Sequence, residues 1–438
     1  MITLNNTVIG NDSVIFNFII NNRRQLNDIQ LLYKFSNNGS LSETKKITEF
    51  NNNTFSLTIQ LKEELLPEKS KIEIEFSKDN ENGILGSWTY NKTGFEADKY
   101  IASYPSRMIG LSLTNNCNLK CSMCWQRDKS AIHYLSVDSI KKIVDSISIF
   151  GRPPVYLWGG EPLLHPNIWE IIQYLKSKNF FTIINTNGYL LNDNIKAILD
   201  NKVDMLIISI DGLEETHNTV RGNNKAFSKL ISAIKELQKI KTRRPILTIN
   251  CVINENNYNK LTDLVALKKE LKAEFLEFQF MMFFSEKEKD GYKQMLNKLF
   301  NAKSTSIDYY PENQDKTDMN VLLSQINTIK KENDPNIRFF PYPVNTDEKV
   351  REYYSNPNRI GINKCKNIEN SIWVESNGDI VPCSCFPDYT IGNINQQGVF
   401  DIWNNQKFLD FREKLDTALF PICRRCCDLY KTDFFQSK

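Results

Sequence analysis

The sequence predicts an α/β protein built around a partial, TIM-like (β/α)6 barrel, with an all-β, sandwich-like domain before it and a small cysteine-rich module after it. Three observations support this prediction. Short β-rich runs fill residues 1–98, strand-like and helix-like patterns alternate over 105–284, and cysteines recur within 361–428. With 438 residues, 41% of them hydrophobic, the chain is long enough to form two or three domains with cores of their own.

The N-terminal domain is predicted from its β-rich runs, which are residues 13–20, 29–35, 54–61 and 71–76. Asn, Gly, Ser and Asp separate these runs at close intervals, and several runs alternate polar and apolar residues. Both patterns are typical of antiparallel strands in a sandwich. Residues 1–98 contain neither Cys nor His, so we expect this domain to dock a substrate or a partner rather than to carry out chemistry.

From residue 105 the pattern changes to β/α units, which are typical of a parallel sheet covered by helices. The predicted strands are 108–114, 154–159, 181–187, 205–211, 246–253 and 275–281, and the predicted helices are 137–149, 166–178, 192–200, 226–240 and 258–272. The Ser136 hydroxyl is placed to cap the first helix. Active sites of β/α barrels lie at the C-terminal ends of the strands, so we expect functional residues in the loops that follow them.

The segment after the barrel is rich in charged residues and asparagine. Residues 285–360 include helical patches at 293–300 and 321–327, which predict a helical bridge. The cysteine-rich module is expected to occupy 361–428, and a polar tail, 429–438, closes the chain.

Cys117, Cys121 and Cys124 have the spacing C-x3-C-x2-C in the loop after the first predicted barrel strand. Three thiolates this close together can hold three corners of an iron-sulfur cube and leave the fourth iron without a protein ligand. Such an iron can bind a small chelating molecule. Structural zinc sites instead use paired C-x2-C motifs and need a fourth ligand, so a zinc loop that borrows a distant ligand is the alternative.

With this cysteine motif the chain resembles the radical S-adenosylmethionine (radical SAM) enzymes from about Met108 onward. One departure is Met123, because the residue before the third cysteine is usually aromatic in that family. The resemblance implies a [4Fe-4S] cluster whose open iron chelates the amino and carboxylate groups of S-adenosylmethionine. One electron from the cluster would then yield methionine and a 5′-deoxyadenosyl radical, while the protein binds and orients the reactants.

The segment Gly159, Gly160, Glu161 and Pro162 follows the second predicted strand and matches the GGEP motif of that family. Two glycines let the backbone approach a ligand closely. The resemblance implies that this segment holds the methionyl amino group of the cofactor, in part through the Glu161 carboxylate. Taken alone, a tight Gly-Gly turn before a helix explains the same residues.

Polar residues follow along the next three predicted strands: Asn187 ends the third, Ser209 and Asp211 end the fourth, Arg221 comes ten residues later, and Asn250 lies within the fifth. The S-x-D-G segment at Ser209 and the later Arg-Gly at Arg221 stand at the spacing found in radical SAM enzymes. The resemblance implies that these side chains bind the ribose or the methionyl carboxylate, with Arg221 pairing bidentately with the carboxylate and Asn250 facing the adenosyl group. A surface turn and a solvated arginine are the alternatives for each residue taken singly.

A second group of cysteines comprises Cys365, Cys383, Cys423 and Cys426. The first two flank a predicted hairpin, 372–383, which turns at Asn-Gly. This segment resembles the SPASM and twitch modules of radical SAM enzymes, and the shorter twitch form implies one auxiliary [4Fe-4S] cluster held by these four thiolates. Structural zinc at the same thiolates is the alternative. Two further cysteines, at positions 385 and 427, are either substitute ligands or buried thiols.

The resemblance implies hydrogen abstraction from a peptide or protein, or from a carbohydrate-type substrate, with electrons from an external flavodoxin- or ferredoxin-like reductant. The auxiliary cluster would assist oxidation or positioning. Cys251, isolated on a predicted strand, is a candidate hydrogen donor for a redox-neutral epimerase, although a lone Cys there more often packs in a core. The alternative from another class is a non-enzymatic iron-sulfur or zinc scaffold with a β-sandwich binding domain.

Charge and composition restrict the partners and the compartment. The chain has 55 basic and 52 acidic residues, a net charge of +3, and no basic patch, which does not favour nucleic acid or a membrane surface as partner. Residues 1–8 lack the basic and apolar regions of a signal peptide, and no segment has the apolar length of a membrane span. Ten cysteines in clusters suit metal binding better than disulfides, so a cytoplasmic protein is predicted.

Overall fold

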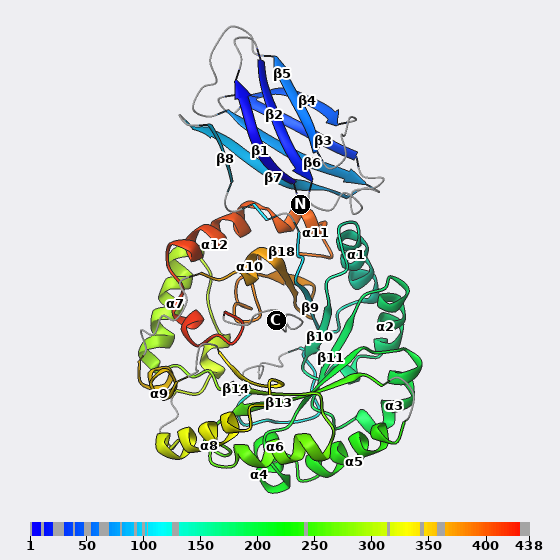
Figure 1. Cartoon of the computed structure of the whole chain (residues 1–438), viewed down its shortest axis with the longest axis vertical. Helices are drawn as coiled ribbons and strands as arrows, with labels where there is room; N and C mark the ends of the chain where they lie inside the picture. The colour runs from blue at the N-terminus through cyan, green and yellow to red at the C-terminus, as the bar shows by residue number, and fades with distance from the viewer. Residues whose placement is uncertain are drawn as a thin grey trace. The chain divides into compact units, whose positions relative to one another are not determined.

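The computed structural model describes most of the chain (Figure 1). The described residues are 2–9, 13–20, 30–37, 40–47, 54–60, 70–78, 81–91, 94–98, 101–102, 104–124, 131–240, 244–312, 316–341, 346–356 and 364–429. The chain divides into two compact units, each considered separately below. Unit 1 comprises Met1–Ser106, Lys142–Arg152 and Ile391–Glu413, and unit 2 comprises the remainder.

Unit 1 contains two antiparallel sheets, ordered β1-β2-β5 and β4-β3-β6-β7-β8. Their strands are β1 (Ile2–Ile9), β2 (Ser13–Ile20), β3 (Gln30–Asn37), β4 (Ser40–Ile47), β5 (Thr54–Gln60), β6 (Lys71–Lys78), β7 (Glu81–Asn91) and β8 (Gly94–Ala97). The four predicted β-rich runs are confirmed as β2, β3, β5 and β6. The other four strands were not predicted.

Aromatic side chains form the described core of unit 1. Phe18 on β2 and Trp88 on β7 pack edge to face across the two sheets, with ring centroids 5.1 Å apart. Phe76 on β6 packs in the same manner on Phe150 and Phe400, at 4.6 and 4.9 Å. These contacts bury large apolar areas, so segments distant in sequence belong to one core. Unit 1 also holds β18 (Gly392–Asn393), α11 (Val399–Trp403) and most of α12 (Gln406–Thr417).

Unit 2 is built on one curved, open sheet. Its parallel strands are β9 (Met108–Thr114), β10 (Val155–Gly159), β11 (Thr182–Thr186), β12 (Met205–Ser209), β13 (Ile246–Ile253) and β14 (Phe275–Phe280). These strands confirm the predicted β/α units, with ends that differ by at most two residues. The sheet continues on one side to β15 (Ile337–Phe340) and on the other to β16 (Ser371–Val374) and β17 (Asp379–Val381).

The β16–β17 pair makes the sheet mixed. β16 runs parallel to β9, whereas β17 runs antiparallel to β16 and forms the predicted hairpin with its turn at Gly378, whose φ of +89° suits glycine. Within the described residues, β15 does not pair with the β16–β17 side, so the barrel is not closed. The helical bridge predicted over 285–360 was wrong in one respect, because it contains β15, which is only four residues long and lies in a charged segment.

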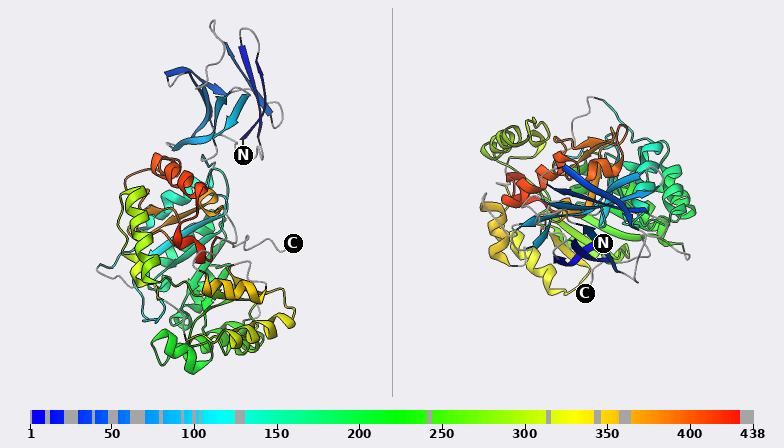
Figure 2. Two further views of the ribbon diagram at one scale, coloured as in Figure 1. Left: turned by 90° about the vertical axis from the view of Figure 1, so that its left-hand side faces the viewer. Right: turned by 90° about the horizontal axis from the view of Figure 1, so that it is seen from above.

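Helices cover the outer face of this sheet (Figure 1), and Figure 2 shows the chain from two further sides. They are α1 (Val137–Ser148), α2 (Ile168–Ser177), α3 (Leu191–Asp200), α4 (Glu214–Arg221), α5 (Ala226–Gln238) and α6 (Leu261–Glu270). The Ser136 hydroxyl accepts a hydrogen bond from the Ser139 amide at 3.1 Å, which confirms the predicted cap of α1. The sequence did not predict α4, which is short and polar.

The remaining helices of unit 2 follow the barrel. They are α7 (Glu286–Phe300), α8 (Met319–Lys331), α9 (Asp347–Ser355) and α10 (Asn367–Asn370), with 3-10 turns η2 (Pro162–Leu164), η3 (Ser306–Tyr309) and η4 (Pro421–Arg425). Ser285 begins α7 with a capping box to Glu288. No helix within the described ranges is long and apolar enough to cross a membrane.

The two faces of the sheet differ. Residues paired across parallel strands point to the same face. Ile183, Met205 and Ile207 pack with Tyr156 and Phe275 on the face away from the helices, which we call the inner face. Ser209 and Asn250 lie opposite each other in the register of β12 and β13 and share this face by alternation.

Candidate active site and auxiliary cysteine cluster

The cysteine loop, Cys117 to Cys124, leaves the C-terminal end of β9, the edge of the sheet where sites of β/α barrels form. Its three thiols are half-buried. The Thr114 hydroxyl donates to the His133 carbonyl at 2.7 Å and accepts from the Asn116 amide at 3.1 Å, which fixes the start of the loop. These hydrogen bonds tie the start of the loop to the segment around His133.

The glycine pair after β10 packs directly against this loop. The Gly160 amide donates to the Thr114 carbonyl at 2.6 Å, and the Glu161 amide donates to the Asn116 carbonyl at 2.8 Å. A Cβ at Gly159, whose φ is +125°, would lie 2.4 Å from the Thr114 oxygen, and one at Gly160 would lie 2.1 Å from the Asn116 oxygen. Both glycines are therefore required for the two backbones to meet.

Glu161 is fully buried and has three protein donors. One carboxyl oxygen accepts from the Leu163 amide at 3.1 Å and from the Thr186 hydroxyl at 2.7 Å, and the other accepts from the Asn187 amide at 2.8 Å. Burial raises the pKa of this carboxyl, while the hydrogen bonds oppose the rise. In this structure Glu161 holds the loop after β11, and its contact with the cofactor amino group stays a prediction.

Asn187 lies beside the first cysteine. Its side-chain nitrogen, Nδ2, is 2.8 Å from the Asn118 side-chain oxygen and 3.7 Å from the Cys117 sulfur. The structure therefore brings this predicted cofactor residue to the cysteine loop. Pro162 begins the 3-10 turn η2 and is buried.

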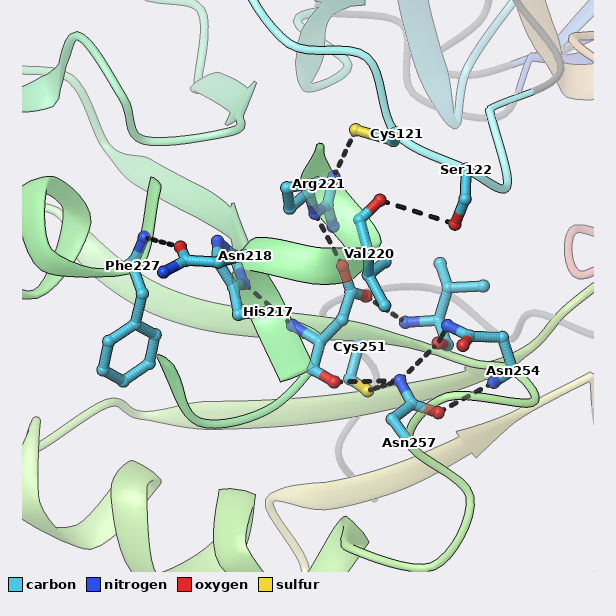
Figure 3. A network of polar contacts seen from close by, with 12 residues as sticks. Cys121, Ser122, His217, Asn218, Val220, Arg221, Phe227, Cys251, Asn254 and Asn257 are labelled. Carbon is cyan, nitrogen blue, oxygen red and sulfur yellow. Dashed lines mark hydrogen bonds and ion pairs between the residues drawn. The ribbon is translucent and has the colours of Figure 1, made fainter. Parts of the chain in front are cut away.

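Arg221 joins the cysteine loop to the fourth barrel strand (Figure 3). Its Nε lies 2.6 Å from Asp211 Oδ2, and its Nη1 lies 3.6 Å from the Cys121 sulfur. The other Asp211 oxygen accepts from the Val252 amide at 3.0 Å. Burial opposes the charge on Arg221, but Asp211 and Cys121 raise its pKa, so it remains a cation. Both predicted residues thus meet at the cysteine loop, and their contacts with the cofactor stay predictions.

The C-terminal end of α4 also holds the loop. The Ser122 amide donates to the Val220 carbonyl at 2.9 Å. Gly222 ends the helix with φ of +62°, and a Cβ there would lie 2.7 Å from the Lys120 carbonyl oxygen. His217, on the same helix, accepts from the Asp211 amide at 3.3 Å, and burial together with the Arg221 charge lowers its pKa to about 3. The sequence contains these residues but does not show that they contact the cysteine loop. We use the name Arg221 latch for the contacts of Arg221 with Asp211 and Cys121.

Cys251 lies on the face opposite Asn250. It is fully buried, it is in register with Phe278, and the Asn257 amide nitrogen is 3.5 Å from its sulfur. Burial raises the pKa of this thiol well above its usual value. This placement between sheet and helices favours core packing over the predicted role as hydrogen donor, which stays untested. Ser209 and Asn250 are half-buried.

The second group of cysteines gathers around the hairpin end and η4. Cys383 follows β17, while Cys423 lies within η4 and Cys426 directly follows it. Burial and the neighbouring Cys426 raise the pKa of the Cys365 thiol to about 12 in the metal-free protein. The Cys385 sulfur lies 3.6 Å from that of Cys426, so this thiol also belongs to the group.

Arg425 anchors the turn that carries two of these thiols. It is buried and forms an ion pair with Glu288 at 2.8 Å. It also donates to the Phe283 carbonyl at 3.0 Å and to the Tyr353 carbonyl at 3.3 Å, and it stacks 4.1 Å from the Phe283 ring centroid. The sequence gave no signal for this residue, because its partners are distant along the chain.

The donor sets suit iron-sulfur clusters. Each group places cysteine thiols, the ligands that such clusters require, on ordered backbone. Family models agree with this reading: residues 111–267 match the Radical SAM superfamily, and residues 365–427 match the SPASM iron-sulfur cluster-binding domain. The chain carries a radical SAM domain followed by a SPASM domain. These domains imply a [4Fe-4S] cluster that binds S-adenosylmethionine and auxiliary iron-sulfur binding.

Curated relatives are similar to this chain over half of its length or more. The radical SAM chain is 24% identical over 357 residues to the tungsten-containing aldehyde ferredoxin oxidoreductase cofactor-modifying protein of Pyrococcus furiosus, covering 74% of this chain and 90% of that protein. It is 28% identical over 240 residues to the sporulation killing factor maturation protein SkfB of Bacillus subtilis, covering 54% of each.

Several solved structures share the fold. One of them is Streptococcus suis SuiB bound to the precursor peptide SuiA, with a TM-score of 0.54 and 16% identity, covering 71% of this chain and 67% of SuiB. At this identity the likeness concerns the fold alone.

Proposed function

We propose that this radical SAM enzyme cleaves S-adenosylmethionine reductively and abstracts a hydrogen atom from its substrate. The main support for this proposal is the position of the cysteine loop, which the glycine pair and the Arg221 latch hold at the C-terminal edge of the sheet. When bound there, a [4Fe-4S] cluster supplies the electron that converts S-adenosylmethionine to methionine and a 5′-deoxyadenosyl radical.

The protein's own residues orient the reactants. Cys117, Cys121 and Cys124 would hold the cluster, and Gly159 and Gly160 keep their loop against it. Asn187 and Arg221, both close to this loop, would contact the cofactor, together with Ser209 at the end of β12 and its neighbour Asn250 on β13. The auxiliary cluster would be held by Cys365, Cys383, Cys423 and Cys426, and it would accept an electron from the substrate radical or position the substrate.

We propose a peptide or protein as the substrate. SkfB is named for maturation of a killing factor, and SuiB binds a precursor peptide, which supports this class. A small-molecule cofactor is the second candidate, because the relative from P. furiosus, of which this chain covers 90%, is named as cofactor-modifying. The two sheets of unit 1, which we propose form a sandwich, would dock the substrate or a partner. An external one-electron reductant is required.

The test uses anaerobically reconstituted protein with dithionite and S-adenosylmethionine. We expect release of 5′-deoxyadenosine, and no release from the variant in which Cys117, Cys121 and Cys124 are all alanine. Iron analysis should find about eight irons per chain in the wild type and about four in this variant. Undiminished release from the triple variant would contradict the proposal, as would a zinc-loaded, iron-free protein.

A further inference from the structure

Polar residues that the cysteine motifs do not explain lie on the inner face, beneath the cysteine loop. Asn185 and Thr248 are both in register with Ile207, so they point to the same face. Glu375, directly after β16, is hydrogen-bonded to Ser112 on β9. We call these residues on the inner face the polar layer, or the layer. It lies close to the proposed cofactor site, because Asn185 on β11 is two residues before Asn187, and a Cβ at Gly159 would lie 3.0 Å from the Ser112 oxygen.

Four atoms of this layer are buried and lack hydrogen-bond partners among the described residues: Glu375 Oε1, Asn185 Oδ1, Thr248 Oγ1 and Trp373 Nε1. An unsatisfied buried polar atom is costly, typically about 1–3 kcal/mol, and needs a reason. Glu375 forms no ion pair with any described lysine or arginine. The layer therefore presents two acceptors, the Glu375 carboxyl and the Asn185 oxygen, together with the Thr248 hydroxyl, which can donate or accept, and the Trp373 indole donor.

Aromatic rings flank these atoms. The Trp158 and Trp373 rings pack edge to face at 5.7 Å, and Tyr156 lies 6.3 Å from Trp373 and 6.5 Å from Trp158. Aromatic rings beside a carboxyl are the surroundings in which proteins hold ammonium and guanidinium groups. A cation of this kind donates hydrogen bonds and accepts none, which complements the Glu375 and Asn185 oxygens.

The auxiliary cysteines approach the same layer. Tyr156 is hydrogen-bonded to Asn185, and burial together with the charges of Asp428 and Cys427 raises its pKa far above the usual value. The auxiliary group also reaches these rings by packing, because Tyr156 and Cys383 both pack against the cluster that contains Trp158 and Trp373. A group bound in this layer would lie between the cysteine loop and the auxiliary cysteines.

We propose that Glu375, Asn185, Thr248 and Trp373 form a subsite for a lysine or arginine residue of the peptide substrate. The carboxyl of Glu375 and the Asn185 oxygen accept from the cationic side chain, the rings of Trp158 and Trp373 flank it, and the Trp373 N–H donates to a neighbouring peptide carbonyl. This inference rests on the proposed function, because it defines the substrate of the same site.

The test measures binding without reductant, so that no turnover is needed. Anaerobically reconstituted protein with S-adenosylmethionine is titrated with N-acetyl-Gly-Lys-Gly-amide and with the matched norleucine peptide, and intrinsic tryptophan fluorescence reports binding. We expect the lysine peptide to bind at least about tenfold more tightly, because a charge-assisted hydrogen bond contributes about 1.5–3 kcal/mol. Glu375→Gln should abolish this preference, whereas the surface control Glu236→Gln should keep it.

Each result decides the question. Equal binding of the two peptides by the wild type, or binding of neither, would overturn the subsite and leave ordered water as the partner of these atoms. A preference retained in Glu375→Gln would overturn the role of this carboxyl. The wild-type comparison stands even if Glu375→Gln does not fold. Failure to release 5′-deoxyadenosine with dithionite is a separate measurement, and that result would contradict the proposed function instead.

Discussion

Replacing Asp211 by asparagine tests the latch that joins the cysteine loop to the fourth barrel strand. Asp211 is fully buried and lies 2.6 Å from Arg221. Asparagine keeps an oxygen for the Val252 amide but removes the counter-charge, and Arg221 remains a cation. Removing one partner of a buried ion pair typically costs about 3–5 kcal/mol, because the other charge stays buried and uncompensated.

The assay is urea unfolding of the metal-free protein, followed by far-UV circular dichroism. Asp211→Asn should lower the free energy of unfolding by about 3–5 kcal/mol. The matched control is Asp200→Asn, which breaks the ion pair with Lys196 on α3, where the two side chains are 57% and 90% exposed. This control should change stability by about 0.5 kcal/mol or less. A loss below about 1 kcal/mol in Asp211→Asn would refute the latch as a stabilising contact.

Three further predictions concern the two clusters and the inner face. Gly160→Ala should lower the iron content of reconstituted protein from about eight to about four, because the added Cβ would lie 2.1 Å from the Asn116 oxygen; an unchanged iron content would contradict the requirement for glycine. Cys383→Ser should also lower iron to about four and Cys385→Ser should leave about eight, and the reverse pattern would make Cys385 the ligand. Glu375 has its pKa raised from 4.5 to about 7 by burial, with the Asp379 charge adding to the rise and the Ser112 hydrogen bond opposing it. The folded state therefore binds the extra proton, and wild-type stability should fall by about 3 kcal/mol relative to Glu375→Gln as pH rises from about 4.5 to about 7. Parallel pH profiles of unfolding for the two proteins would exclude this effect.

The sequence predicted the barrel well because its strands are buried runs of apolar residues with long amphipathic helices between them. The cysteine loop and the glycine pair were also identified, since short local motifs carry their chemistry in residue type and spacing. Helix α4 was not predicted because its eight residues are mostly polar. Strand β15 was not predicted because its four residues, in a charged segment, are too few to show a periodic pattern of apolar residues.

Contacts between distant residues had no sequence signal. Arg425 and Glu288 are 137 residues apart, and only folding brings them together. The buried atoms of Asn185 and Thr248 that lack partners among the described residues were equally hidden, because hydrogen-bond partners become visible only in the folded chain. Which face of a parallel strand a polar residue occupies depends on register, and register is set by the neighbouring strands.

The parallel pairing of β16 with β9 has a consequence for electron transfer. Cys117 follows β9 and Cys383 follows the hairpin built on β16, so the backbone hydrogen bonds of these strands help to set the spacing of the two groups of thiols. Ordinary side-chain substitutions leave such a ladder in place. Changing the separation needs an insertion or deletion in β16, which moves the chain by about 3.3 Å per residue and reverses every side chain beyond it. Such a change would therefore alter the distance between the two groups of thiols in whole steps of the sheet, and with it the path of an electron between any clusters that they hold.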